Sequence, residues 1–531
     1  MVWQISKKDF LNNIITSRFI ISCFICLLVI PFAIYINIYN YENEKKVYET
    51  EKDRIEQELK NVKVYSFYRP EILREPEPLS IFCSGIIENI GNSIKIKFKE
   101  KPMFMDRNTQ ERENPLLSSF FNIDFISIIA ILLSLIALIF SYDAFIKERT
   151  DCTLKLMLIN SISKTKVYIG KFFGITLTIL PILFICYTLS ILLIVINPNI
   201  SFGVSEWGRI LLLFFISIFY FMVFVALGFF LSVVIRNSVS SIIISLLLWI
   251  LFLFIVPNVN IYIAEFYVKP EKLALLDYEF QKIDDDYLKH SQTFEKKLQV
   301  PSYPIVSSGP NDDGGWQVTR TSIECIEYYH KLAKFQTNIL LENASKKEKL
   351  QTQHIANLIK QANLARWISC ISPAEIFKHS STSVCFTDAN SYWNFMKQVQ
   401  EYYESFIKSI LKDEIINSLQ FVTPITKENI LTADEIISQA SNGKYKTIDE
   451  ANIAQQSLGI IRKAIYTDNK FPKLDVNYYS NIDFNKFPSF SYPKYGVEKA
   501  ITNSLTYLGI LVLMLLILLA ITIFKVRVYK I

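Results

Sequence analysis

Residues 141–174, SYDAFIKERTDCTLKLMLINSISKTKVYIGKFFG, are charged and mixed in character and lie between two apolar runs. The segment TLKLMLI at 153–159 has the pattern of a short helix. One face of that helix would carry Leu154, Met157 and Leu158. A short exposed helix with an apolar face is suited to docking another protein. An amphipathic helix resting on lipid headgroups is the alternative. Either way, the chemistry offered here is binding.

Motifs for covalent or metal chemistry are missing from the chain. Its four histidines are scattered without metal-ligand spacing; they are His290, His330, His354 and His379. No G-x-x-x-x-G-K-[ST] phosphate loop occurs, because the Gly-Lys pairs in IGKFFG and NGKYKT lack the hydroxyl residue that should follow. No G-x-S-x-G elbow occurs either. We therefore expect no catalytic residue, no metal and no cofactor bound by this chain, which would not itself be an enzyme.

Composition indicates membrane spans joined to sizeable water-exposed segments. The chain has 531 residues, of which 51% are hydrophobic and 20% are charged. Six stretches have the length and apolarity of a spanning helix: about 19–40, 123–141, 172–196, 209–235, 239–257 and 502–524. No ionisable side chain lies well inside them, which argues against an ion-coupled carrier. The net charge of +6 is small for this length and gives no support for a nucleic-acid partner.

Lysine and arginine near the span ends predict the orientation. They gather in the N-terminal segment, the 141–174 stretch, the connection at 236 and the tail KVRVYKI. All four fall on one side if both termini are cytoplasmic. Residues 142–171 would then be the only substantial cytoplasmic loop. Ahead of the first span, residues 3–14 fit an interfacial helix; a plain extension of the span is equally open.

Two long segments would then lie outside. Residues 41–63 have the pattern of a polar helix, and SIKIKFK at 93–99 has the alternation of a strand. Residues 262–299 and 317–367 have helical periodicity, separated by a loop at 301–315. A further helix at 388–419 carries one stripe, Tyr392, Phe395, Val399, Tyr402 and Phe406, which we interpret as a core face. A disulfide among the cysteines of these segments stays open; they are Cys83, Cys325, Cys370 and Cys385.

The predicted fold class is an α-helical polytopic membrane protein. Six transmembrane helices would be accompanied by a small mixed α/β domain and a larger, mainly α-helical extracytoplasmic domain. The expected division is 1–40 for the interfacial helix and first span, 41–122 for the small α/β region, 123–257 for spans two to five with the loop 142–171, 258–501 for the helical domain, and 502–531 for the last span and the tail.

The 141–174 stretch resembles the cytoplasmic loop of ABC transporter permeases of the second exporter type. Matching positions are Asp143, Glu148, Arg149, Thr153, Leu154, Lys155, Leu156, Ser161, Ser163, Gly170 and Lys171. The chain departs from the pattern at Cys152, where glycine is usual, and at Ile162, where proline is usual. Similarity to a subfamily with a large extracytoplasmic insert between spans five and six extends to 64–85, 371–377, 381–406 and the C-terminal end.

The resemblance implies that a separate ATPase, which binds ATP and magnesium, docks on the 153–159 helix. Glu148 and Arg149 would fix the loop, and the residues in or near the ATPase cleft would be Leu154, Leu156, Met157 and Leu158. A second permease chain, identical or not, would complete the transporter in a bacterial inner membrane. The cargo would be amphipathic, lipid-like or a peptide, with a periplasmic partner an open question. The alternative is a membrane-anchored binding or sensor protein that grips an envelope partner with its helical domain.

Overall fold

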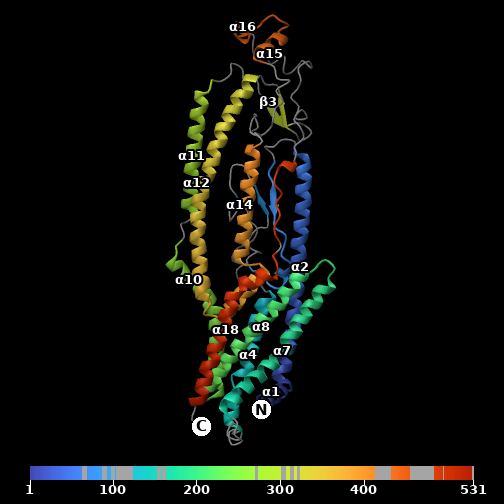
Figure 1. The fold of residues 1–531 in the computed structure, drawn as a ribbon, viewed down its shortest axis with the longest axis vertical. Coiled ribbons are helices and arrows are strands. Elements are labelled where there is room, and N and C mark those ends of the chain that lie inside the picture. The colour runs from blue at the N-terminus through green and yellow to red at the C-terminus, as the bar shows by residue number, and fades with distance from the viewer. Residues whose placement is uncertain are drawn as a thin grey trace.

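The computed structural model describes residues 1–62, 68–85, 93–96, 102, 124–151, 153, 157, 163–269, 273–299, 307–310, 316–319, 323–412, 432–454, 484–493 and 495–528. Within these residues the chain is mostly helical, and the two chain termini lie at the same end of an elongated molecule (Figure 1). We call this end of the helix bundle the terminal end and the opposite end the distal end.

Six helices are long and apolar enough to cross a membrane, as the sequence predicts. They are Ser17–Lys60, Phe125–Thr150, Lys164–Ile196, Val204–Val234, Ser238–Tyr267 and Val497–Val528. The first belongs to a continuous 45-residue helix, α2 (Ser17–Asn61), so the polar helix predicted at 41–63 prolongs the first span without a break. The others are built from α4 (Phe125–Ser141) with α5 (Ala144–Thr150), α7 (Lys164–Ile196), α8 (Val204–Val234), α9 (Ser238–Ile250) with the π-helical turn η5 (Leu251–Ile255) and α10 (Val256–Tyr267), and α18 (Val497–Val528).

Two of these helices form the centre of the bundle. The most apolar windows of the α4 and α8 spans are 67% and 61% buried, whereas that of the α9–α10 span is 11% buried. At the α4–α8 contact, a Cβ added to Gly228 would lie 1.9 Å from Ser141 Oγ, so only glycine permits this approach. The outer helices leave long apolar side chains exposed, as lipid-facing surfaces do.

The N-terminal helix α1 (Val2–Ile14) is separate from the first span. The backbone is extended at Thr16, which precedes α2, so the expectation of a plain helical extension is wrong. One face of α1 packs on α7, while Trp3 and Leu11 remain exposed on the face that was predicted to rest on the membrane surface.

The part of the molecule beyond the distal end of the bundle, which we call the distal domain, holds a helical hairpin (Figure 1). It also contains an aromatic core. Helices α11 (Leu273–Lys297) and α12 (Ile323–Ser369) pair in antiparallel fashion, with Phe294 stacked on Phe335 at 3.7 Å. The stripe predicted to be a core face lies on α14 (Ala389–Lys412) and is buried throughout, packing against β1 (Glu71–Leu73) and β2 (Ser93–Lys95).

Two short helices, two 3-10 turns and a strand hairpin are also among the described elements. The helices are α15 (Ala433–Ala440) and α16 (Ile448–Ile453), and the 3-10 turns are η8 (Phe484–Lys486) and η2 (Pro78–Ile81), which precedes α4. Strands β3 (Ser307–Pro310) and β4 (Trp316–Thr319) pair in an antiparallel hairpin. The 301–315 segment was predicted to be a plain loop, so that prediction is wrong for β3, since the proline- and glycine-rich composition hid a short strand.

Helix α13 (Pro373–Cys385) packs into the bundle although it is not one of the six spans. Phe377 stacks on Tyr220, near the middle of α8, with ring centroids 4.4 Å apart. At its start, Ser372 Oγ donates a hydrogen bond of 2.6 Å to the carbonyl of Phe252 in η5. The π-helical turn leaves backbone groups without their usual hydrogen-bond partner. Ser372, at the start of α13, supplies a donor for one of these carbonyl groups. The division of the chain into domains remains a prediction, and α13 links the proposed outer domain tightly to the spans.

Candidate functional site

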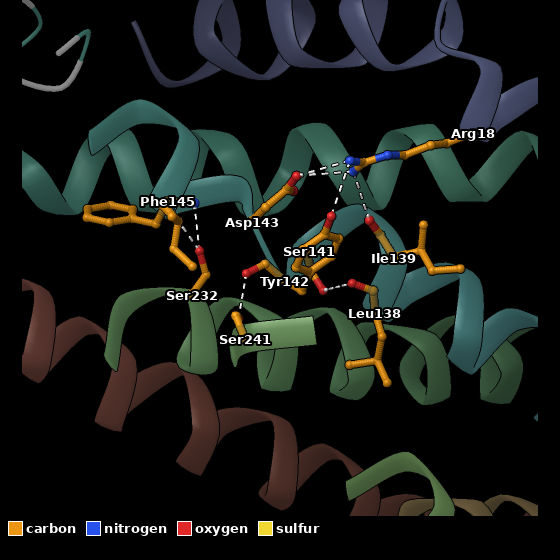
Figure 2. Close-up of polar contacts among 10 residues, drawn as sticks. Arg18, Leu138, Ile139, Ser141, Tyr142, Asp143, Phe145, Ser232 and Ser241 are labelled. Carbon is orange, nitrogen blue, oxygen red and sulfur yellow. Dashed lines mark hydrogen bonds and ion pairs between the residues drawn. The ribbon is translucent and has the colours of Figure 1, made fainter. Parts of the chain in front are cut away.

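The turn between α4 and α5, at the terminal end, is held by a hydroxyl from another helix. α4 ends at Ser141, and the turn formed by Tyr142 and Asp143 leads into α5. Figure 2 shows Ser232 of α8 facing the start of α5, where its Oγ accepts hydrogen bonds from Phe145 N at 2.8 Å and Ile146 N at 3.2 Å. The first amides of a helix need such partners. α5 is therefore capped by α8 rather than by its own sequence.

Asp143, the residue before α5, makes no capping bond and instead pairs with Arg18 at the start of α2. The two groups are 3.2 Å apart, and the same guanidinium donates to the carbonyl of Ile139 at 3.2 Å (Figure 2). The Arg18 side chain is 45% exposed, so this ion pair contributes modestly to stability. Its effect is geometric, because it ties the start of α2 to the end of α4.

Two further contacts use carbonyls at helix ends, which lack intrahelical partners. Ser241 of α9 donates to the carbonyl of Tyr142 at 2.8 Å, as Figure 2 shows. Arg149 of α5 donates through Nη2 to the carbonyl of Val233, near the end of α8, at 3.4 Å. Residues 142–150, which we call the anchored turn, are thus attached to α2, α8 and α9.

A buried lysine joins the anchored turn to two more helices. Lys171 of α7 has a side chain that is 8% exposed, and its Nζ lies 2.7 Å from Glu148 Oε1 and 3.2 Å from Asp9 Oδ2. Glu148 belongs to α5 and Asp9 to α1. A buried ammonium is tolerated when carboxylates surround it in this way. Burial raises the pKa of Asp9, an effect that the neighbouring Lys171 only partly offsets.

Glu148 also contacts the first residue of the predicted docking helix. Thr153 Oγ1 donates to a carboxylate oxygen of Glu148 and, at 3.3 Å, to its backbone carbonyl. Contacts therefore run from α1 through Lys171 and Glu148 to Thr153. The role of fixing the loop, which the resemblance implied for Glu148 and Arg149, stays a prediction.

Two glycines allow α1 to approach this site closely. A Cβ added to Gly170 would lie 2.9 Å from Ile5 Cβ, and one added to Gly174 would lie 2.9 Å from Asp9 Cβ. The carbonyl of Gly170 accepts a 2.7 Å hydrogen bond from Ser6 Oγ. The spacing of four residues places both glycines on one face of α7, as in helix pairs with small residues at the contact.

The structure brings together most of the predicted site residues that it describes: Asp143, Glu148, Arg149, Thr153, Gly170 and Lys171. Met157 packs against the core of the bundle. Four predicted residues, Leu154, Lys155, Leu156 and Leu158, lie outside the described residues.

Sequence reasoning missed four residues of the site: Asp9, Arg18, Ser232 and Ser241. Asp9 had a signal, since it is an acid on an N-terminal helix that otherwise carries Lys7 and Lys8. The serines had none, because their role depends on which helices are neighbours. Among the residues that the structure describes, no group of three or more His, Cys, Asp or Glu side chains is arranged to hold a metal ion. The contacts described at this site are hydrogen bonds and ion pairs that join helices.

A search of curated proteins found no match to this chain. A family model described as "ABC-2 family transporter protein" matches residues 3–529, nearly the whole length. Permeases of this family are generally non-catalytic membrane subunits of ABC transporters. The chain, a multi-pass membrane protein with its charged loop anchored at one end of the bundle, belongs to the ABC-2 family of transporter proteins.

Proposed function

We propose that this chain is a permease whose conformational changes are driven by a separate ATPase subunit. That subunit binds ATP and magnesium and docks on residues 153–159. Both termini and this loop would face the cytoplasm of a bacterial inner membrane, where ATP is present. The anchored turn would carry the movement of the docked subunit into the spans. No catalytic step is assigned to this chain.

The observation that supports this proposal best is the set of contacts around Lys171 and the anchored turn. A docked partner can move several helices together if its docking element is attached to each of them. Glu148 binds Thr153 on the loop side and Lys171 on the bundle side. Ser232 and Asp9 add attachments to α8 and α1. A displacement of the loop would therefore reach α1, α5, α7 and α8 together.

A second permease chain, identical or different, would complete the transporter. The α9–α10 and α18 spans have 11% and 17% of their most apolar windows buried, so both have wide apolar surfaces for lipid or for another chain. The cargo we propose is an amphipathic, lipid-like or peptide molecule, exported or extracted from the membrane. Apolar span surfaces, with the buried charges that the structure describes confined to the span ends, support this class. The distal domain would guide release or contact a periplasmic partner.

The test is capture of the tagged full chain from its native membrane in mild detergent, with mass spectrometry of the proteins that accompany it. A Leu154→Asp, Leu158→Asp variant is captured in parallel. A matched control, Leu275→Asp with Leu288→Asp, places the same changes at half-exposed leucines of α11, far from the loop. We expect an ATPase with the wild type and the α11 control, and its loss from the loop variant.

Two results would contradict the proposal. Absence of an ATPase from the wild type, even after chemical crosslinking in the membrane, would favour a binding or sensor protein that acts through its distal domain. An ATPase retained by the loop variant would leave the permease assignment intact but place docking elsewhere, with 153–159 resting on lipid.

A further inference from the structure

Two cysteines that are 302 positions apart in the sequence meet at the distal end of the bundle. Cys83 follows the turn η2, and Cys385 is the last residue of α13. Both are free thiols in the structure, they are 1% and 0% exposed, and their side chains are hydrogen-bonded to each other. The contact joins the segment that leads into α4 to the helix that packs between α8 and α18.

The backbone is fixed on each side of this cysteine pair. Gly85 has a positive φ of 60°, and a Cβ added there would lie 2.3 Å from the carbonyl oxygen of Thr387. Arg74 donates through Nη2 to the carbonyl of Phe386 at 3.3 Å, and Ile126 N donates to the carbonyl of Phe82 at 3.1 Å. These contacts hold the chain segments that carry Cys83 and Cys385 side by side.

The surroundings suit a structural bond better than a reactive thiol. The Cys83 side chain is also hydrogen-bonded to the buried carboxylate of Asp124. Its pKa is raised by the hydrogen bond to Cys385, by burial and by the negative charge of Asp124. A thiol held in its neutral form is a poor nucleophile and metal ligand. Once oxidised, the pair would be shielded from reductants by the same burial.

We propose that Cys83 and Cys385 form a structural disulfide on the extracytoplasmic side of the membrane. Each sulfur loses its proton, two electrons pass to a thiol–disulfide oxidoreductase of that compartment through a mixed disulfide, and one S–S bond replaces two S–H bonds. Oxidation would occur before the distal domain closes over the sulfurs. The bond would tie α13 to the entrance of α4. This inference rests on the orientation given under the proposed function.

The chain contains an internal control for the chemistry. Cys26 of α2 and Cys186 of α7 also have hydrogen-bonded side chains, and both are buried. This pair lies within two membrane spans, where a protein oxidoreductase has no access. Proximity alone would oxidise both pairs, whereas exposure to the oxidising compartment during folding would oxidise only Cys83 and Cys385.

The test is mass spectrometry of the full chain, purified from its native membrane under conditions that block thiol exchange and then alkylated in denaturant without reduction. We expect the peptides of Cys83 and Cys385 to be linked, two hydrogen atoms lighter than their sum, and to separate after reduction. Cys26 and Cys186 should be alkylated without reduction. In a Cys83→Ser variant, Cys385 should become alkylated without reduction. Unreduced alkylation of both Cys83 and Cys385 in the wild type would overturn the proposal.

An orientation control separates this failure from a failure of the proposed topology. Tyr278 of α11 is 62% exposed, so a Tyr278→Cys substitution offers a reporter thiol. In spheroplasts, a membrane-impermeant maleimide should label this cysteine. Labelling together with free Cys83 and Cys385 would overturn the disulfide and leave the orientation standing. No labelling until the membrane is opened would contradict the orientation itself.

Discussion

At each end of the bundle a buried cation lies between two carboxylates, and the two arrangements differ in an instructive way. At the terminal end, Lys171 lies between Asp9 and Glu148, which come from two other helices. At the distal end, Arg209 of α8 lies 2.6 Å from Glu77 and 2.9 Å from Glu206 of its own helix.

The two clusters also differ in the type of cation that they contain. The Arg209 guanidinium is 2% exposed and lies over the Phe386 ring, 4.9 Å from its centroid, so it is fixed by both hydrogen bonds and stacking. Lys171 has a compact charge on a flexible stem and no ring partner among the interactions described. Arginine holds a planar arrangement, whereas lysine can keep its partners while they shift. We therefore infer that the cluster of Arg209, Glu77 and Glu206, which we call the lock, is rigid. The cluster of Lys171, Asp9 and Glu148, which we call the joint, can change its geometry without losing its ion pairs.

Removal of the distal lock should have the largest effect. Arg209→Met leaves Glu77 and Glu206 without their cation in a buried place, where burial already raises the pKa of Glu77. Loss of one partner from such a cluster costs about 3–5 kcal/mol. We expect a clear fall in the apparent unfolding temperature in detergent, measured by tryptophan fluorescence. Arg209→Lys keeps the charge and loses the stacking, so its unfolding temperature should lie between those of the wild type and Arg209→Met. An unchanged unfolding temperature for Arg209→Met would show that the lock does not stabilise the protein.

Acid should weaken the same end. His379 of α13 faces Ser369 at 2.9 Å, Glu375 at 3.7 Å and the Tyr507 ring, with the charges of Arg366 and Lys378 nearby. Burial, helped by those two cations, lowers the pKa of His379 to about 4. In the unfolded chain a histidine titrates at about 6.5. As pH falls from about 6.5 to about 4, the unfolded state therefore gains a proton that the folded state refuses, and about 3 kcal/mol of stability is lost.

The measurement is the unfolding temperature as a function of pH for the wild type and for His379→Gln. The slope between pH 6.5 and 4 should be shallower in the variant. His290→Gln, at an exposed histidine of α11, is the matched control and should keep the wild-type slope. Equal slopes for wild type and His379→Gln would show that another group titrates.

A methyl group should disturb the joint without changing its charges. Gly170→Ala would place a Cβ 2.9 Å from Ile5 Cβ, and overpacking of this kind costs about 1–3 kcal/mol. We expect α1 to detach partly, seen as faster proteolysis of residues 1–14. Gly509→Ala on α18, where no atom lies within 4 Å of the added Cβ, should leave proteolysis unchanged and stabilise the helix by up to about 1 kcal/mol. Equal protection in both variants would mean that the close α1–α7 contact is not needed.

Removal of the cap on α5 should have the smallest effect of these changes. Ser232→Ala removes the hydroxyl that accepts from Phe145 N and Ile146 N, which should cost about 1 kcal/mol. Hydrogen exchange of the α5 amides should accelerate, while exchange in α8 should not. Ser190→Ala, which loses only a bond within its own helix, should leave α5 exchange as it is. No change in α5 after Ser232→Ala would show that the cap is dispensable.

The sequence predicted what depends on local pattern. Apolar runs of the right length indicated all six spans, and the stripe on 388–419 indicated a core face, because both follow from helical periodicity. The spacing of Glu148, Thr153 and Lys171 in the loop indicated a common site only through the resemblance to a family.

What depends on tertiary neighbours was out of reach. Ser232 caps α5 from 86 positions away, and Asp9 reaches Lys171 only because α1 turns back along α7. The ISPAEIF segment gave no sign that Phe377 would stack on Tyr220 inside the bundle, since its polar neighbours Ser380 to Ser383 are buried by helices far away in sequence.

We propose that the joint at Lys171 passes movement from a docked ATPase to the spans, and ATP hydrolysis by the captured complex tests this transmission directly. The captured complex, returned to lipid, is assayed for ATP hydrolysis and for retained ATPase with wild type, Lys171→Met and Lys171→Arg. We predict that Lys171→Met keeps the ATPase bound but hydrolyses ATP at least about fivefold more slowly, the range of a typical coupling energy, and that Lys171→Arg recovers much of the rate. Wild-type hydrolysis by a stably folded Lys171→Met complex would contradict the account.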